Sequence, residues 1–266
     1  MRKLENPMGW SFNYIAITND IERATTLSDC GVQQIMVDIE IIGKVERQGH
    51  KNTVISKHGL SDVLKLKQLN LKSEIICRIN PFNIATKMEV DSAIEYGADI
   101  IMIPMINSLE DYRSIVNMIG SRAEVLPLIE TPYSFFKVHE IISYSEIKQI
   151  HFGLNDLCIS LGMRNLFEVL LSETFQNIVS NIDVKSMRVG IGGIGDPQVH
   201  QKVDALLLLN TYLKCGASSV ILSRNFFASN YDQEYIAHSL NRFEEIIDRG
   251  YDQNHDEKLF SQVYEM

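Results

Sequence analysis

Acidic side chains follow several short apolar segments of this chain. Glu130 comes directly after the apolar run of residues 125–129, and Asp156 comes just after the segment 149–154. Two carboxylates suit a hard divalent cation such as Mg²⁺, which takes one or two protein carboxylates and leaves its other positions to water and substrate oxygens. We therefore expect Glu130 and Asp156 to be ligands of a divalent cation.

A positively charged side chain also lies near the end of an apolar segment. Arg78 lies near the end of the segment 74–80, and its planar guanidinium matches a carboxylate in shape and charge. Together with the two acidic residues, it points to a chelating, anionic substrate such as a 2-oxo acid. The substrate carboxylate would lie between the arginine and the metal, and the metal would polarise the keto oxygen.

Each of these residues also has a purely structural interpretation. Glu130 precedes Thr131 and Pro132, a plausible helix start, so it could be a favourable charge at a helix N-terminus. Asp156 could cap the helix-like turn that follows it. Arg78 could be a structural ion-pair partner of Asp38 or Glu40, and Glu40 could have that role alone.

Three histidines carry further alternatives. His151 stands inside the segment 149–154, which favours a place in the core, and His58 is expected at the surface. His50 lies in the irregular stretch 41–59, and long loops of this kind are often functional. Its ordinary pKa would suit proton transfer if the loop folds over the site.

The elements that must position these residues alternate regularly. Short β-rich segments are separated by amphipathic stretches, and several segments are nearly continuous apolar runs, as expected when both faces of a strand are covered. The expected strands are residues 12–18, 34–40, 74–80, 99–105, 124–130, 149–154, 188–193 and 219–224. Helices lie between them, and a last one is expected at about 232–248. Ser108 and Asp111 resemble a capping box, and Gly97, Gly120 and Gly216 are expected helix stops.

Eight such units in 266 residues predict a single (βα)8 TIM barrel in one domain, residues 1–266. A doubly wound sheet is the alternative. In a barrel of this type the site lies at the C-terminal ends of the strands, where Glu40, Arg78, Glu130 and Asp156 would meet. The N-terminal strand ends show no comparable gathering of polar residues. The tail from about 250 to 266 could pack on a neighbouring subunit.

Composition excludes several classes of protein. The formal charge is -9 with no basic block, which argues against a nucleic-acid or membrane partner. The four cysteines are scattered, as in reduced cytoplasmic proteins. The N-terminus resembles no signal peptide, and no apolar run approaches the roughly 20 residues of a membrane span. We expect a cytoplasmic protein.

Four segments are similar to the signature segments of one known family. "CRINP", "GADIIMIPMINSLED", "LPLIET" and "HFGLNDLCISLG" resemble, in that order, those of the HpcH/HpaI aldolase and citrate lyase beta-subunit family. The resemblance implies a barrel that binds pyruvate or phosphoenolpyruvate with Mg²⁺ or Mn²⁺. Carried over by position, Glu130 and Asp156 resemble the metal ligands and Arg78 the substrate-binding arginine. Thr131 and Gly153, beside those ligands, are expected to contact the substrate. Homo-oligomers are common in the family, so we expect one.

One position departs from the family pattern. Asp38 and Glu40 match the family, but Ile41 stands where relatives resembling this chain carry an acid or a histidine. His50, Glu40 or a metal-bound water could supply the proton-transfer group instead.

The leading hypothesis is a metal-dependent carbon–carbon lyase of the aldolase type that acts on a 2-oxo acid or hydroxy acid. The alternatives are citrate-lyase-like cleavage of an acyl thioester, with coenzyme A or an acyl carrier as partner, and a non-catalytic metabolite-binding barrel.

Overall fold

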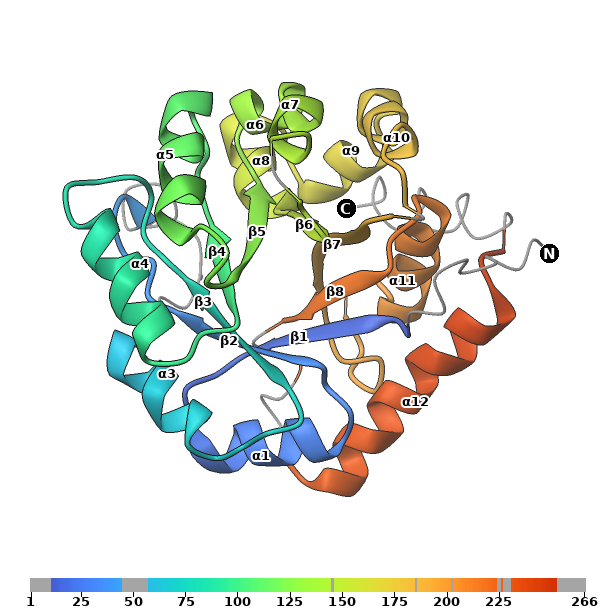
Figure 1. Ribbon diagram of the computed structural model, residues 1–266. Helices are drawn as coiled ribbons and strands as arrows, with labels where there is room; N and C mark the ends of the chain where they lie inside the picture. The colour runs from blue at the N-terminus through green and yellow to red at the C-terminus, as the bar shows by residue number, and fades with distance from the viewer. Residues whose placement is uncertain are drawn as a thin grey trace.

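Eight parallel strands form a closed barrel in the order β1 to β8 (Figure 1). The structure is a computed structural model, and it describes residues 11–44, 57–144, 146–184, 186–201, 203–223, 226 and 231–252. The strands are β1 (Asn13–Ile17), β2 (Gln34–Asp38), β3 (Glu74–Arg78), β4 (Ile100–Ile103), β5 (Glu124–Ile129), β6 (Gln149–Phe152), β7 (Arg188–Ile194) and β8 (Ser219–Leu222). The expected (βα)8 TIM barrel is confirmed.

Helices surround the barrel, and α1 and α12 lie side by side where the ring closes (Figure 1). The helices are α1 (Ile21–Asp29), α3 (Leu60–Lys67), α4 (Thr86–Glu95), α5 (Leu109–Ile119), α6 (Pro132–Phe136), α7 (Val138–Ile142), α8 (Leu154–Ser160), α9 (Leu166–Leu171), α10 (Glu173–Ser180), α11 (Ala205–Lys214) and α12 (Gln233–Arg249). Within the part of the chain that the structure describes, none is long and apolar enough to cross a bilayer.

The helix boundaries follow the local signals in the sequence. The Ser108 hydroxyl accepts a hydrogen bond from the Asp111 N–H at 3.0 Å and caps α5. Gly97, Gly120 and Gly216 end helices with φ of 96°, 58° and 85°, a region in which a side chain would be strained. Each helix therefore stops where the chain must turn into the next strand.

Apolar side chains fill the barrel on both sides of the sheet. A small inner cluster contains Ile15, Met36, Ile76 and Leu128, all buried. The larger cluster lies between the sheet and the helices. Because side chains alternate across a strand, the residues at the strand ends that share the inner face point toward the barrel mouth.

Polar residues also gather at the N-terminal ends of the strands, where the sequence predicted no such gathering. The Asn13 amide donates hydrogen bonds of 2.9 Å to Gln34 and to Ser219. Gln34 in turn donates to Glu74 at 3.0 Å and to Gln149 at 3.3 Å. The prediction was wrong because these residues begin strands that are widely separated in the sequence, and only barrel closure brings them together. Their hydrogen bonds to one another indicate a structural role.

Candidate active site

Four strand ends contribute residues to the candidate site at the C-terminal mouth. Asp38 and Arg78 are the last residues of β2 and β3 and lie directly opposite each other in the strand register. Glu130 follows β5, and Gly153 follows β6 and precedes α8. Parallel strands deliver all their C-terminal ends to one face of the barrel, which explains why these residues meet.

Arg78 makes a two-pronged ion pair with Asp38. Its Nε donates to Oδ1 at 2.8 Å and its Nη2 donates to Oδ2 at 2.7 Å. Burial raises the pKa of Asp38, but the charges of Arg78 and Lys44 outweigh burial and hold this pKa well below its ordinary value. Arg78 is therefore an ion-pair partner of Asp38, as the structural interpretation predicted. Within the part of the chain that the structure describes, no residue bonds the remaining Nη1, which is the edge that can meet a ligand.

Glu40 lies within the same set of charges. Its Oε2 is 3.6 Å from Arg78 Nε and 3.4 Å from the Nζ of Lys44. Its side chain is only 1% exposed, so the two cations lie beside a buried carboxylate. Sequence reasoning placed Glu40 at this mouth but missed Lys44, because a lysine in a long polar stretch usually lies in solvent.

Glu130 is buried at the end of β5 and is held by the loop after β4, the neighbouring strand. Its Oε1 accepts a hydrogen bond of 3.0 Å from the N–H of Met105. Met105 has a φ of 49°, rare for a side chain of its size, and such strain is common at functional sites. A Cβ at position 153 would lie 2.8 Å from the Glu130 Cβ, so Gly153 leaves the space that this carboxylate occupies.

The electrostatics of Glu130 place other acidic groups nearby. Burial raises its pKa to about 8, and the negative charges of Glu40 and Asp156 act in the same direction. Arg78 and the Met105 N–H oppose the shift only partly. A buried carboxyl with two acidic neighbours and a raised pKa indicates a place that favours a positive ion.

Asp156 lies in the first turn of α8, which has Gly153 as its N-cap residue. It is 8% exposed and faces the buried side of the helix. The interpretation of Asp156 as the cap of this helix is wrong, because the helix begins three residues earlier than the sequence indicated.

The residues of the mouth fit a cation that keeps part of its coordination shell for water and substrate oxygens. Among the residues that the structure describes, no three His, Cys, Asp or Glu side chains form a complete metal site. Glu130 and Asp156 offer two carboxylates, which matches the small protein contribution that Mg²⁺ usually accepts. Burial and the negative charges of Glu40 and Asp156 raise the pKa of Glu130, so a cation bound beside it would be favourable.

The hydroxyl of Thr131 bonds the backbone at the start of α6 and in the loop after β4. Its Oγ1 donates to the Ile106 carbonyl at 2.6 Å and accepts from the Ser134 N–H at 3.0 Å. It is the N-cap of α6 and is 1% exposed. The hydroxyl expected to contact a substrate is therefore used to cap a helix. Glu130, one residue earlier, points its carboxylate at Met105 and lies just outside the helix start.

The three histidines divide among three situations. His151 is buried inside the barrel, and its Nε2 donates to the Gly192 carbonyl at 2.9 Å. Burial lowers the pKa of His151 to about 4, so it is neutral and part of the core, as its place in a strand indicates. His58 is half-buried, and its Nδ1 accepts the Asp38 N–H at 3.0 Å, so the expected surface position is wrong. His50 lies outside the described residues.

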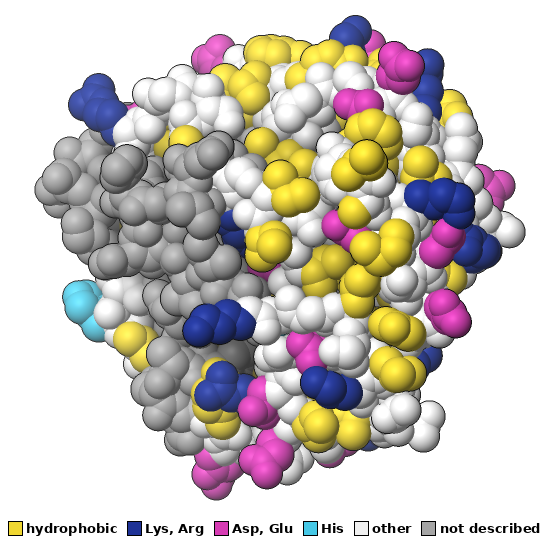
Figure 2. Space-filling model, turned by 90° about the vertical axis from the view of Figure 1, so that its left-hand side faces the viewer, with side chains coloured by type: hydrophobic (Ala, Val, Ile, Leu, Met, Phe, Trp, Pro, Cys, Tyr) yellow, Lys and Arg dark blue, Asp and Glu magenta, His cyan; other side chains and the backbone are white. Residues whose placement is uncertain are grey.

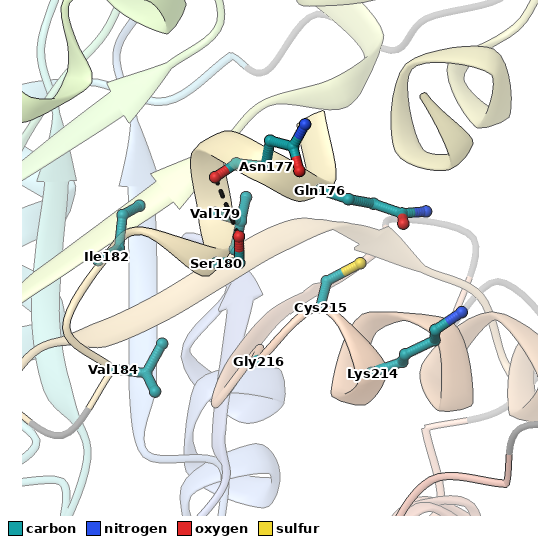
Figure 3. Close-up of a pocket in the computed structure, with 9 residues that line it drawn as sticks. All are labelled: Gln176, Asn177, Val179, Ser180, Ile182, Val184, Lys214, Cys215 and Gly216. Atoms are coloured by element: carbon teal, nitrogen blue, oxygen red, sulfur yellow. Dashed lines mark hydrogen bonds between the residues drawn. The ribbon is translucent and has the colours of Figure 1, made fainter. Parts of the chain in front are cut away.

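A separate pocket of about 380 Å³ lies between α10 and α11 (Figure 3). Ser180, Val184, Lys214 and Cys215 are among its lining residues, and the Ser180 hydroxyl bonds the Asn177 carbonyl at 3.0 Å. The pocket is formed at the C-terminal ends of two helices, which is the end of the barrel opposite to the mouth. None of the described residues that line it is acidic, so it offers no carboxylates for a cation.

The fold and the mouth define a class of protein: a parallel (βα)8 barrel with carboxylates and an arginine at the C-terminal ends of its strands. The chain belongs to the HpcH/HpaI aldolase/citrate lyase family, whose model matches residues 24–180. Aldolases and lyases make up this family. No curated protein matches the chain.

Two solved structures are similar to this one. An HpcH/HpaI aldolase from Desulfitobacterium hafniense DCB-2 has a TM-score of 0.60 at 15% sequence identity, covering 89% of this chain and 94% of its own. An HpcH/HpaI aldolase/citrate lyase family protein from Burkholderia cenocepacia J2315 has a TM-score of 0.61 at 14% identity, covering 88% of this chain and 94% of its own. At such low identity the similarity establishes the shared fold.

Proposed function

We propose that this protein is a carbon–carbon lyase that depends on a divalent cation and acts on a 2-oxo acid or a related hydroxy acid. The observation that carries the proposal is the pairing at one mouth of buried Glu130, near Asp156 and Glu40, with the guanidinium of Arg78. Such a site can bind a cation through its carboxylates and, beside it, a substrate carboxylate through Arg78. A 2-oxo acid presents both an anionic group and a chelating keto oxygen.

The residues divide the work by their chemistry. Glu130 and Asp156 would hold Mg²⁺ or Mn²⁺, which supplies Lewis-acid polarisation of the keto oxygen when bound. The Nη1 edge of Arg78 would bind the substrate carboxylate, while its Nε and Nη2 are fixed by Asp38. Gly153 would leave room for Glu130 to reach the cation. Asp38 orients the arginine, which keeps the substrate in one position for cleavage.

The proton-transfer group is proposed among the residues around β2. Ile41 is 58% exposed and carries no titratable group, so it does not supply a base. Glu40 is the carboxylate at the same strand end, and it lies near both Arg78 and Glu130. We propose Glu40 or His50 as the group that positions or moves the proton, with Glu40 the better supported by the described contacts.

The test is a reaction with defined probes. Purified protein with Mn²⁺ and pyruvate should exchange the methyl protons of pyruvate for deuterium, followed by NMR, and should add pyruvate to a panel of aldehydes. Glu130→Gln and Asp156→Asn should lose both Mn²⁺ binding and exchange. A protein that binds Mn²⁺ and oxalate but exchanges no proton would support the non-catalytic alternative. Cleavage of an acyl thioester without aldehyde release would support the citrate-lyase-like alternative.

We also propose a homo-oligomer, supported by the apolar surface of one side of the barrel. Figure 2 shows the side on which α3, α4 and α5 lie, and hydrophobic side chains reach the surface there at several points. Ile84 is fully exposed, and Phe82 and Met88 are 44% and 55% exposed. Burial of such residues stabilises subunit contacts. Light scattering should find an oligomer in the wild-type protein and a smaller species in Ile84→Glu.

A further inference from the structure

Lys44 is a buried lysine within the candidate site. Its side chain is 3% exposed, and its Nζ lies 2.9 Å from Asp38 Oδ2 and 3.4 Å from Glu40 Oε2. A lysine is almost never buried without an anionic partner, because desolvation of the ammonium is costly. Here two carboxylates compensate it, and both stand at the end of β2.

The backbone that carries Lys44 is fixed to the barrel. The side-chain oxygen of Asn80 accepts hydrogen bonds from the N–H groups of Ile41 and Ile42, at 2.9 and 3.0 Å. Asn80 is itself held by two bonds of 3.0 Å to the carboxylate of Glu89. The Lys44 N–H closes a turn on the Ile41 carbonyl at 3.2 Å. The first residues after β2 are thereby held against the end of β3, with the ammonium directed inward.

Lys44 offsets part of the negative charge that the described residues place at the mouth. We define the mouth cluster as Asp38, Glu40, Lys44, Arg78, Glu130 and Asp156. With every carboxyl ionised, as cation binding requires, its four carboxylates and two cations leave a formal charge of −2. One divalent cation would neutralise it. Without Lys44 the cation-loaded cluster would lose one positive charge and bind an anion less tightly.

We propose that Lys44 sets the charge of the mouth cluster so that the cation-loaded protein accepts an anionic substrate. This inference rests on the proposed function and names Lys44 as a positioning and specificity residue for it. Lys44 acts through Asp38 and Glu40, which it holds beside Arg78. Its positive charge thereby raises the affinity for the anionic substrate and lowers the affinity for the divalent cation.

The test measures Mn²⁺ binding and oxalate binding separately, by calorimetry, on the full chain. In Lys44→Gln, Mn²⁺ should bind as well as in the wild type or up to about tenfold more tightly, since a positive charge has been removed. Oxalate should bind the Mn²⁺-loaded variant at least about tenfold more weakly for the same reason. Lys44→Arg should retain most of the oxalate affinity. Lys65→Gln, which removes a 56% exposed lysine paired with Asp62, should change neither.

A double variant separates charge from support of the fold. Lys44→Gln with Glu40→Gln restores the formal charge of the cluster and keeps the ion pair of Arg78 with Asp38, so oxalate binding should recover by several-fold relative to Lys44→Gln. Thermal unfolding of each variant identifies any that does not fold, and Lys44→Arg then provides the comparison with wild type. Unchanged oxalate affinity in Lys44→Gln overturns the inference and leaves the proposed function standing. Parallel loss of both ligands, with no recovery in the double variant, assigns Lys44 a structural role instead. Absence of Mn²⁺ binding in the wild type overturns the proposed function and the inference together.

Discussion

Gly153→Ala tests whether the space beside Glu130 matters to the candidate site. The backbone of Gly153 has φ −85° and ψ 83°, which alanine can adopt, so backbone strain is not the issue. The added Cβ would lie 2.8 Å from the Glu130 Cβ and 2.9 Å from its Oε2. Carbon atoms in contact are normally about 3.5–4.0 Å apart, so the Glu130 side chain must move by roughly 0.7–1.2 Å.

The consequence should be larger for the cation than for the fold. Metal–ligand distances are held to within about 0.2 Å, and disturbing the groups that position a ligand typically lowers metal affinity about 10- to 100-fold. Overpacking should reduce the free energy of unfolding by about 1–3 kcal/mol. We expect weaker Mn²⁺ binding in calorimetry, with a lower but still cooperative thermal transition.

Gly193→Ala is the matched control. It adds a methyl group at the end of β7, where the nearest atom is the Ile221 carbonyl oxygen at an ordinary 3.6 Å. Mn²⁺ affinity and stability should both change little. If Gly153→Ala folds and binds Mn²⁺ like the wild type, Glu130 is not a cation ligand or the packing around it gives way more easily than the geometry indicates.

Three other predictions follow from the same contacts. Glu130→Gln should make the cation-free protein more stable near pH 8, because the ionised carboxyl is disfavoured in the folded state as pH rises from about 4.5 toward 8, and it should abolish stabilisation by Mn²⁺ in thermal unfolding. Arg78→Lys keeps the charge but loses the two-pronged bond to Asp38, so oxalate binding should fall on the order of tenfold while Mn²⁺ binding persists. His151 has its pKa lowered from 6.5 to about 4, so the unfolded chain takes up its proton first and stability should decline as pH falls through that window, by roughly 3 kcal/mol in all. Urea unfolding at pH 7 and 5 should show a smaller loss for His151→Leu than for the wild type, and equal losses would contradict the assignment of a buried neutral imidazole.

The fold could be predicted largely from the sequence because its signals are local. Each strand is a short apolar run, and glycines such as Gly97 and Gly216 end helices by allowing a positive φ. The end of a strand is also a local feature, so Glu130 and Arg78 could be assigned to the mouth. The helix-cap bond of Thr131 could not be predicted, since a hydroxyl before proline serves a helix cap or a ligand equally well in sequence.

Contacts between distant segments were not predictable in the same way. The polar network of Asn13, Gln34 and Ser219 joins strand starts that are far apart in sequence, and the choice of Asp38 as partner of Arg78 depends on the register of β2 against β3. Lys44 gave no signal because its burial depends on Asn80 fixing the chain after β2.

The sequence by itself therefore determined the eight strands, the barrel and the presence of carboxylates and Arg78 at one mouth. Periodicity and strand ends are written in neighbouring residues, and parallel strands in a barrel share one direction. Only the tertiary structure decided that Arg78 is fixed by Asp38, that His58 lies against the Asp38 backbone and that Lys44 is buried at the mouth. Those outcomes depend on barrel closure and register, which set the distances between charges, and electrostatic energy depends on distance.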